Sequence, residues 1–442
     1  MSQPHSPSTA LLTDQYELTM VQAALANGTA NRRCVFEVFT RRLPAGRRYG
    51  VVGGTGRFLE ALTDFRFTDA ELEHLRAKGV FDEELLQFLA EYRFSGNIYG
   101  YAEGEVFFPG SPVLVVESTF AEGVILETLA LSVLNYDSAV ASAASRMTSA
   151  AGSRPCLEMG SRRAHEQAAV AAARAAVVGG FASTSNLEAG RRYGLETIGT
   201  AAHSFTLLHD DEPSAFAAQV AAFGPNTTLL VDTYDIAQGV RRAIEAAGTD
   251  LDAVRLDSGD LAVVAGEVRE QLDSLGAAGT KIVVSSDLDE HAIAALAVAP
   301  VDAYGVGTSL VTGSGAPTAG MVYKLVSREG AGGQMEPVEK ASSAKTSVGG
   351  RKNAARRMDA AGRAEEEIVV AGAGADWEPD DEDLRPLQVP LVIDGEVDRA
   401  FTGADGVRRA ARRHQLSRAE LSPYARRLSS GDPALETVHS SL

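Results

Sequence analysis

Between residues 156 and 307 the chain alternates short apolar or β-branched runs with alanine-rich or amphipathic stretches. The helical stretches are clearest at 164–178, 236–247 and 261–275. Strands that alternate with helices are typical of βα units and a parallel sheet. The runs expected to form strands are 156–160, 180–184, 196–200, 228–232, 254–258, 281–286 and 303–307. Seven strands over roughly 150 residues favour an α/β fold built on an irregular, TIM-like βα barrel over an open sheet.

The segments on either side of this region differ from it in composition. At 442 residues, the chain exceeds the length of about 250–300 residues at which a single core stops growing, so two domains are expected. After residue 340 the chain is rich in alanine and charge, with a strand-like run at 388–393 and a basic helical stretch at 406–427. We expect an N-terminal α+β domain at 1–120, a catalytic α/β barrel at 121–340, and a segment at 341–442 that packs with the N-terminal domain.

Charge and cysteine content exclude several classes of protein. A formal charge of −18 argues against a general nucleic-acid binder, because phosphate affinity needs a basic face. No run of about 18 apolar residues predicts a membrane span, and the start lacks the features of a signal peptide. The two cysteines, Cys34 and Cys156, make a disulfide framework implausible, so a cytoplasmic location is expected. If the substrates are anions, a few arginines and backbone amides must create a local positive site.

Nearly every expected strand ends in polar residues or glycine. In a βα barrel the loops that follow the strands build the active site at one face. Any single one of these residues is more often a helix cap or a turn residue, but the set together indicates chemistry at that face. The strand ends concerned are Gly160-Ser-Arg-Arg163, Ser183-Thr-Ser-Asn186, Gly199-Thr200, Asp232, Asp257-Ser-Gly-Asp260, Ser285-Ser-Asp287 and Gly305-Val-Gly-Thr308.

The run Val254-Arg-Leu-Asp-Ser-Gly-Asp260 carries two of the candidate residues. The two-residue period of a strand puts Arg255 and Asp257 on the same side. Arginine offers a planar fork that matches carboxylate or phosphate, and aspartate can accept ribose hydroxyls or help to hold Mg²⁺. The alternative is an internal Arg–Asp ion pair followed by a helix cap, and this motif by itself fits both interpretations.

Two neighbouring strand ends suit a sugar phosphate. Backbone amides at Gly305 and Gly307, with the hydroxyl of Thr308, would bind a phosphate monoester. Asp287 lies one βα unit earlier, so its loop is expected beside the glycine turn. A G-x-G turn is common in proteins, and the pair of loops is therefore more informative than either loop.

Histidine and arginine follow two further strands. A neutral imidazole at His203 can be a base, a nucleophile or a metal ligand, although such a histidine is more often structural. No second His or Cys lies at zinc-ligand spacing. Arg162 precedes a long helix, where arginine does not complement the helix dipole, so binding of a carboxylate substrate is the better explanation.

Five of these motifs, in order and spacing, resemble those of nicotinate phosphoribosyltransferases over residues 11–324. The motifs are Leu11-Leu-Thr-Asp-Gln-Tyr16, Glu158-Met-Gly-Ser-Arg-Arg163, Gly199-Thr-Ala-Ala-His-Ser-Phe205, Val254-Arg-Leu-Asp-Ser-Gly-Asp260 and Gly305-Val-Gly-Thr-Ser309. The resemblance implies a type II phosphoribosyltransferase that works as a homodimer with shared active sites. The reaction implied converts nicotinate, phosphoribosyl pyrophosphate, ATP and water into nicotinate mononucleotide, pyrophosphate, ADP and phosphate, for NAD biosynthesis. ATP is then a co-substrate, although the chain has no P-loop motif, and Mg²⁺ is the implied metal, with its ligands left open.

The resemblance also assigns roles on the ribose-phosphate side. It implies that His203 is phosphorylated, that Arg255 and Asp257 hold the ribosyl substrate, and that Asp287 binds the ribose. It further implies that Gly305, Gly307 and Thr308 form the loop for the 5′-phosphate.

On the base side, the resemblance implies that Tyr16 stacks on the pyridine ring from the partner subunit and that Arg162 lies near the nicotinate carboxylate. The segment from Ser183 to Asn186 bears on base choice, because amide-using relatives place an aspartate near there, whereas this chain has hydroxyls and an amide. One position departs from the family: Met159 stands where phenylalanine is frequent. A thioether can still contact a ring.

Three rival functions stay open. The nearest is a nicotinamide or quinolinate phosphoribosyltransferase. An aldolase-type barrel would need a Schiff-base lysine at a strand end, whereas Lys281 lies at a strand start. A non-catalytic sugar-phosphate-binding protein on the same barrel would bind phosphoribosyl pyrophosphate without releasing pyrophosphate.

Overall fold

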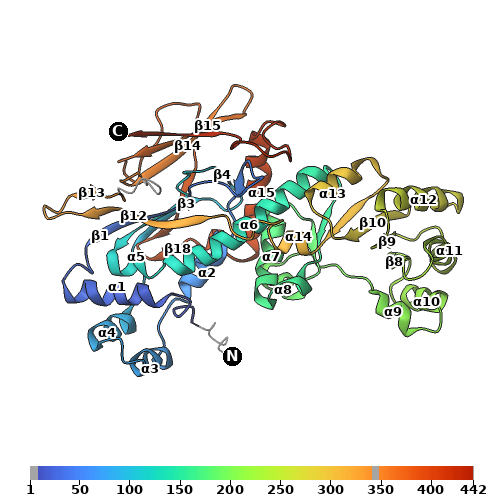
Figure 1. Ribbon diagram of the computed structural model, residues 1–442, viewed down its shortest axis with the longest axis horizontal. Helices are drawn as coiled ribbons and strands as arrows, with labels where there is room; N and C mark the ends of the chain where they lie inside the picture. The colour runs from blue at the N-terminus through green and yellow to red at the C-terminus, as the bar shows by residue number, and fades with distance from the viewer. Residues whose placement is uncertain (1–7, 341–347, 442) are drawn as a thin grey trace. The chain divides into compact units, whose positions relative to one another are not determined.

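The computed structural model describes residues 8–340 and 348–441 of the chain (Figure 1). Its contacts divide the chain into two compact units, one made of Met1–Ser142 with Ala316–Leu442 and the other of Ala143–Gly315. The N- and C-terminal segments therefore share a unit. The unit with the parallel sheet is shorter at both ends than the expected barrel domain at 121–340. The expected boundary at 340–341 adjoins residues 341–347, which lie outside the described residues.

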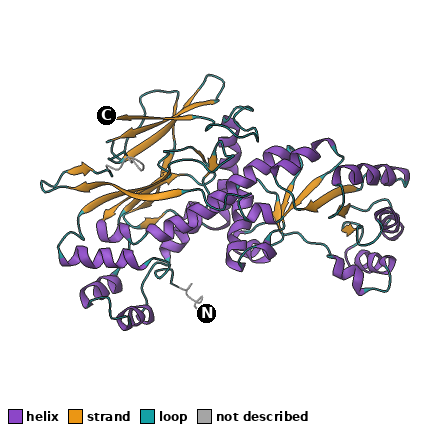
Figure 2. Cartoon of the chain, in the orientation of Figure 1, coloured by secondary structure: helices purple, strands orange, loops and turns teal. Residues whose placement is uncertain are grey.

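A six-stranded, all-parallel sheet organises the unit Ala143–Gly315, with strand order β7-β6-β11-β10-β9-β8. Figure 2 shows its strands flanked by helices. The strands are β6 (Cys156–Glu158), β7 (Ser183–Thr184), β8 (Thr228–Leu230), β9 (Ala253–Leu256), β10 (Lys281–Ser286) and β11 (Ala303–Val306). The predicted βα alternation is confirmed.

The sheet curls as a half-barrel, which only partly matches the expected TIM-like barrel. Among the described residues, no strand pairing joins the edge strands β7 and β8. Six of the seven expected strands form. The exception is the run 196–200, which makes a single bridge, from Thr197 to Thr184. Beyond that bridge, residues 198–202 adopt no regular structure and lead directly into a helix.

Helices follow the strands and begin at residues of the strand-end loops. The side chains of Asp235 and Asp260 accept hydrogen bonds from Gln238 N and Val263 N, which caps two of the helices. The regular helices of this unit after α6 are α7 (Glu166–Val178), α8 (Leu187–Tyr193), α9 (His203–Leu208), α10 (Glu212–Phe223), α11 (Ile236–Ala247), α12 (Leu261–Ser274), α13 (Glu290–Ala295) and α14 (Thr308–Val311). Part of the polar strand-end pattern therefore serves helix capping.

The unit of the chain ends contains a seven-stranded antiparallel sheet, in the order β13-β12-β1-β5-β3-β17-β18. A second sheet of four strands, β16-β14-β15-β19, is built from the C-terminal segment. The strands are β1 (Arg33–Thr40), β2 (Gly50–Val51), β3 (Asn97–Tyr101), β4 (Val106–Phe107), β5 (Leu114–Thr119), β12 (Met321–Glu329), β13 (Met335–Pro337), β14 (Lys352–Met358), β15 (Ala364–Ala371), β16 (Leu384–Pro386), β17 (Gln388–Ile393), β18 (Glu396–Val397) and β19 (Glu436–Ser441).

Most helices of this unit share one apolar core with its larger sheet, and the last of them packs on α2 and β4. The helices are α1 (Gln15–Ala26), α2 (Thr55–Thr63), α3 (Asp69–Ala77), α4 (Glu83–Glu91), α5 (Phe120–Val124), α6 (Glu127–Ala151, which runs on into the second unit) and α15 (Gly403–Glu420). Strand β17 has the expected bounds, whereas α15 ends well before the expected residue 427. The segment Phe120–Ala151 is long and apolar enough to cross a membrane, but it is mostly buried within the protein, as the core helix of a globular protein is.

A buried ion network joins the C-terminal sheet to the rest of this unit. Arg356 on β14 is fully buried and donates to Glu105 at 2.8 Å, Glu367 at 3.1 Å and Glu420 at 3.0 Å. Burial by itself would raise the pKa of Glu105, but the charges of Arg356 and Arg385 lower it to about 2. These charges are stable in the interior only as a matched set.

Substitution Arg356→Ala is expected to destabilise the protein by about 3–5 kcal/mol, because it leaves Glu105 and Glu367 buried without their shared cation. Thermal or urea unfolding measures the change. Arg357→Ala is the matched control, since Arg357 is the next residue on β14 and its pairs with Glu366 and Asp381 lie near the surface. That control should cost at most about 1 kcal/mol. Equal losses for the two variants would contradict this account of the network.

Candidate active site

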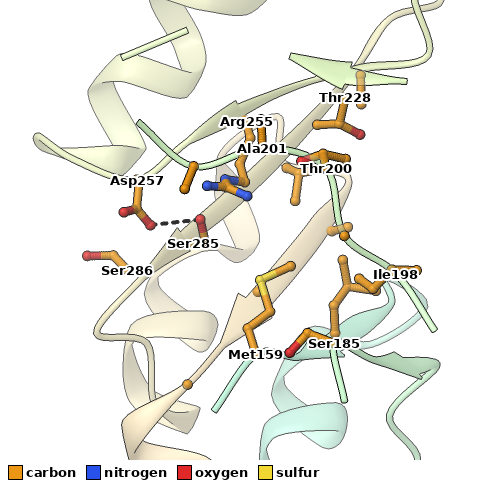
Figure 3. Close-up of a pocket in the computed structure, with 18 of the residues that line it drawn as sticks. Met159, Ser185, Ile198, Thr200, Ala201, Thr228, Arg255, Asp257, Ser285 and Ser286 are labelled. Carbon is orange, nitrogen blue, oxygen red and sulfur yellow. Dashed lines mark hydrogen bonds between the residues drawn. The ribbon is translucent and has the colours of Figure 1, made fainter. Parts of the chain in front are cut away.

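The concave face of the half-barrel holds a cavity of about 1070 Å³. Its walls come from the strands β6, β9, β10 and β11 and from residues 197–202, the run that does not join the sheet (Figure 3). The lining includes Met159, Arg162, Arg163, Ser185, Thr200, Arg255, Asp257, Ser285, Ser286, Asp287, Gly305, Gly307 and Thr308. Most of the strand-end residues singled out in the sequence therefore meet around one space.

Arg255 is the most unusual side chain of this cavity. It lies on β9, and its guanidinium points into the cavity (Figure 3). Its Nε is buried without a hydrogen-bond partner, and among the described residues no ion pair within 4 Å involves it. Burial lowers the pKa of Arg255, the charge of Arg162 lowers it further, and Asp257 and Asp232 oppose both effects. A half-buried guanidinium without an ion-pair partner favours binding of an anion.

Asp257 does not form the internal ion pair with Arg255 that the sequence left open. Its carboxylate accepts a hydrogen bond from Ser285 Oγ at 2.8 Å, and its backbone N–H donates to Asp232 Oδ2 at 2.8 Å. Ser258 Oγ donates to the same oxygen at 2.8 Å. The fully buried side chain of Asp232 thus fixes the loop after β9, and Asp257 joins that loop to β10.

His203 begins α9 and faces Asp232 and Thr233, which follow β8. Its Nδ1 lies 3.1 Å from Thr233 Oγ1, and its Nε2 lies 3.9 Å from Asp232 Oδ1, which is beyond hydrogen-bond distance. The ring is partly exposed, with 40% of the side-chain surface accessible. A partly exposed imidazole next to a buried carboxylate can act as a base or a nucleophile.

The glycine turn after β11 lies against Met159. A Cβ at Gly305 would come within 2.8 Å of Met159 Sδ and 3.0 Å of Ser285 Cβ, so glycine lets the thioether pack on the strand. Gly307 and Thr308 line the cavity, and Thr308 begins the short helix α14. Asp287 lines it too and is exposed. The backbone and carboxylate groups expected to hold a sugar phosphate therefore share the cavity with Arg255.

Four predicted residues, of which His203 is one, do not line the cavity. Ser183 is buried, and it is Ser185, two residues on, that lines the cavity. Asn186 caps α8 through Ala189 N and donates to Ser161 Oγ at 3.0 Å, so it shapes a loop beside the cavity. Tyr16 lies on α1 in the other unit, 45% exposed, and burial and hydrogen bonding to Glu127 raise its pKa.

Sequence reasoning missed the roles of Asp232 and Glu158. In the sequence, Asp232 is recognisable only as a polar residue at a strand end, and Glu158 only as part of a motif. Each carboxylate lies at the end of a strand and accepts hydrogen bonds from a neighbouring loop. Hydrogen-bond geometry reveals this role, whereas the residue type in the sequence does not. The cavity lining from Thr197 to Ala202 was also missed, because its β-branched residues indicated a strand.

Among the described residues, no group of three or more His, Cys, Asp and Glu side chains is arranged to hold a metal ion. Mg²⁺ commonly binds to one or two carboxylates together with substrate phosphates, so such a group is not required. Asp257 and Asp287 are the carboxylates that line the cavity near Arg255 and fit that requirement.

Comparisons with known proteins match most of the chain. The model of the nicotinate phosphoribosyltransferase (NAPRTase) N-terminal domain matches residues 11–135, and that of the nicotinate phosphoribosyltransferase (NAPRTase) family matches residues 155–368. The nicotinate phosphoribosyltransferase pncB1 of Mycobacterium tuberculosis is 57% identical over 438 residues, which cover 97% of this chain and 94% of the relative. The nicotinate phosphoribosyltransferase of Bacillus subtilis is 37% identical over 79% of this chain and 73% of the relative.

Solved structures share the fold. The human nicotinic acid phosphoribosyltransferase structure superposes with a TM-score of 0.83 at 26% identity and covers 97% of each chain. A structure described as nicotinate-nucleotide pyrophosphorylase from Pyrococcus furiosus has a TM-score of 0.75 at 25% identity, with 95% of this chain and 99% of that chain covered.

Proposed function

The chain belongs to the nicotinate phosphoribosyltransferase family, and we propose that it transfers the phosphoribosyl group of phosphoribosyl pyrophosphate to nicotinate, coupled to ATP hydrolysis, in the cavity of the half-barrel. The chain is an enzyme of NAD biosynthesis, as its relatives are. The observation that carries the location is Arg255, a half-buried side chain whose guanidinium points into the cavity without a carboxylate partner among the described residues.

The cavity suits a phosphorylated sugar at one end. Arg255 offers charge, Gly307 and Thr308 offer backbone and hydroxyl donors, and Asp257 and Asp287 offer acceptors for ribose hydroxyls. When bound, Mg²⁺ would be held by these two carboxylates and would offset charge on the phosphates. We place the 5′-phosphate at the glycine turn, because backbone N–H groups bind anions without added net charge.

The base side of the cavity favours an acid. Arg162 lines the cavity and is exposed, and its charge acts on Arg255, so two guanidinium groups are available to anionic groups of the substrates. Ser185 lines the cavity near Met159, and a hydroxyl there does not repel a carboxylate (Figure 3). We propose that Met159 contacts the face of the pyridine ring through its thioether. Nicotinate is therefore preferred over nicotinamide.

The chemistry requires positioning more than proton transfer. The pyridine nitrogen attacks the anomeric carbon with its own lone pair, so no general base is needed. Departure of pyrophosphate leaves positive charge on the ribose, and negative charge grows on the leaving group, beside Arg255. The cavity walls hold the two reactants in line and limit access of water to the ribose.

We propose that ATP acts through phosphorylation of His203. The ring is partly exposed, and its Nδ1 contacts Thr233 Oγ1, whereas its Nε2 makes no hydrogen bond to Asp232 at 3.9 Å and is the nitrogen that can reach a phosphoryl donor. A phosphoryl group there would add negative charge beside the Asp232 carboxylate, which holds the loop of Asp257. The two charges would repel, and the loop after β9 would shift as ATP is used.

We also propose that the chain forms a cytoplasmic homodimer. In this dimer Tyr16 of the partner subunit stacks on the base, so residues of both subunits surround the substrates in the half-barrel. The partly exposed ring of Tyr16, in the unit that does not form the cavity, supports this arrangement. Both cysteines are buried and unpaired, which suits a reducing compartment.

The purified protein is expected to form nicotinate mononucleotide and pyrophosphate from nicotinate and phosphoribosyl pyrophosphate when Mg²⁺ and ATP are supplied. Chromatography of the nucleotides, with nicotinamide and quinolinate as competing bases, measures the reaction and its base preference. Nicotinate should dominate because the base side of the cavity carries arginine and serine. Absence of any mononucleotide would refute the proposed activity, and equal use of nicotinamide would refute the proposed base preference.

Substitution His203→Ala is expected to abolish ATP hydrolysis and phosphate labelling of the protein by radiolabelled ATP, while weak transfer to nicotinate persists. His209→Ala is the matched control, because His209 ends the same helix and its ring packs on Phe205. The control should keep both the label and the ATP hydrolysis. Labelling that survives in the His203→Ala protein would remove His203 from the coupling step.

A further inference from the structure

A buried carboxylate lies at the end of β6, directly beneath the base side of the cavity. Glu158 is 0% exposed, and strand alternation turns its side chain away from the face to which Leu157 and Met159 contribute. No ion pair within 4 Å involves Glu158 in the described part of the chain. Burying a carboxylate without a cation is unfavourable, so stability of the fold does not explain its presence.

The two oxygens of Glu158 bind two different loops. One accepts the backbone N–H of Gly160, in the loop that ends β6, and the other accepts the hydroxyl of Thr184, at the end of β7. Thr184 Oγ1 in turn accepts the backbone N–H of Asn186 at 3.0 Å. Glu158 therefore links both strand ends through its side chain.

Backbone contacts also hold the ends of β6 and β7 close to each other. Glu158 and Thr184 are paired in the sheet, and Ser185 N donates to Glu158 O at 2.8 Å. A Cβ at Gly160 would come within 2.3 Å of Val311 Cγ1, so glycine is needed for the loop to lie this close. A second bond, from Asn186 Nδ2 to Ser161 Oγ, joins the same two loops at 3.0 Å.

These two loops carry the cavity residues that face the base. Met159 and Arg162 belong to the first loop, and Ser185 belongs to the second. Glu158 itself lies outside the cavity lining, so it cannot touch a substrate. Its effect on the reaction must act through the spacing of the loops.

We propose that Glu158, through Thr184, is a positioning residue that sets the spacing of the two loops for recognition of the aromatic acid. This inference rests on the proposed function, since it assumes that these loops bind the base. It predicts that loss of the link weakens the affinity for nicotinate. Binding of the ribosyl substrate at β9, β10 and β11 does not depend on the link.

Steady-state kinetics of Glu158→Gln test the proposal. The amide is neutral and keeps one acceptor oxygen, so the hydrogen bond from Thr184 to a charged carboxylate is lost and at most a weaker, neutral contact from Nε2 to Thr184 Oγ1 replaces it. The KM for nicotinate should rise about tenfold, the effect of losing one hydrogen bond to a charged group. The KM for phosphoribosyl pyrophosphate and kcat should change little. An unchanged KM for nicotinate in a folded variant would overturn the proposal.

A second pair of variants tests the proposal even if the Glu158→Gln protein does not fold. Thr184→Val keeps the shape of the side chain but removes the hydroxyl, and Thr184→Ser keeps the hydroxyl. The valine variant should raise the KM for nicotinate, and the serine variant should restore it toward the wild-type value. If both variants lower the thermal midpoint equally and leave that KM unchanged, the link is structural and the proposal fails.

Glu212→Gln is the matched control for loss of a buried carboxylate. Glu212 is 1% exposed, lies on α10 and pairs with Arg242 at 3.0 Å, away from the two loops. It should lower stability without changing the KM for nicotinate. Wild-type protein that forms no nicotinate mononucleotide would refute the proposed function itself, whereas active wild-type protein with unaltered variants would refute only the role of Glu158.

Discussion

The site depends on one half-buried charge, that of Arg255, which has no ion-pair partner among the described residues. The guanidinium of Arg255 has lost much of its water, its Nε has no hydrogen-bond partner, and the nearby acids are engaged elsewhere. Asp257 accepts from Ser285, and Asp232 accepts from the loop after β9. In a chain with a formal charge of −18, this arrangement keeps a positive group free for an anionic substrate. The protein gives up stability at this position, which is common at functional sites.

Side-chain links between strand ends hold the rest of the site around that charge. Asp232, at the end of β8, fixes the loop after β9; Asp257 connects that loop to β10; Glu158 connects the ends of β6 and β7. Parallel strands present their carboxyl ends at one edge, so short polar side chains there can reach the next loop. These links fix the positions of the strand-end loops along the curled sheet, although its edge strands do not pair with each other in the described part of the chain.

Local patterns predicted the parts of this structure that depend on local rules. The βα alternation and the strand bearing Arg255 follow from side-chain period, and they are confirmed. Gly305 was expected in a turn but lies within β11, and the turn begins at Gly307. The predictions that Ser183 and Asn186 contact the substrate were imprecise, because β7 has only two residues. Contacts with β6 determine which residues of the following loop reach the cavity. Strands β14 and β15 were missed, since their arginine and glutamate residues are buried only through distant partners such as Glu105.

Arg255 is kept for the substrate at the expense of stability. Calorimetric titration of phosphoribosyl pyrophosphate with Mg²⁺ into wild-type, Arg255→Met and Arg255→Lys protein tests it most directly, together with the thermal midpoint of each. The methionine variant should bind at least about tenfold more weakly, because a charged hydrogen-bond donor is lost, while its midpoint does not fall. The lysine variant should retain part of the affinity. Equal affinity of the methionine variant, or a marked loss of its stability, would contradict the account.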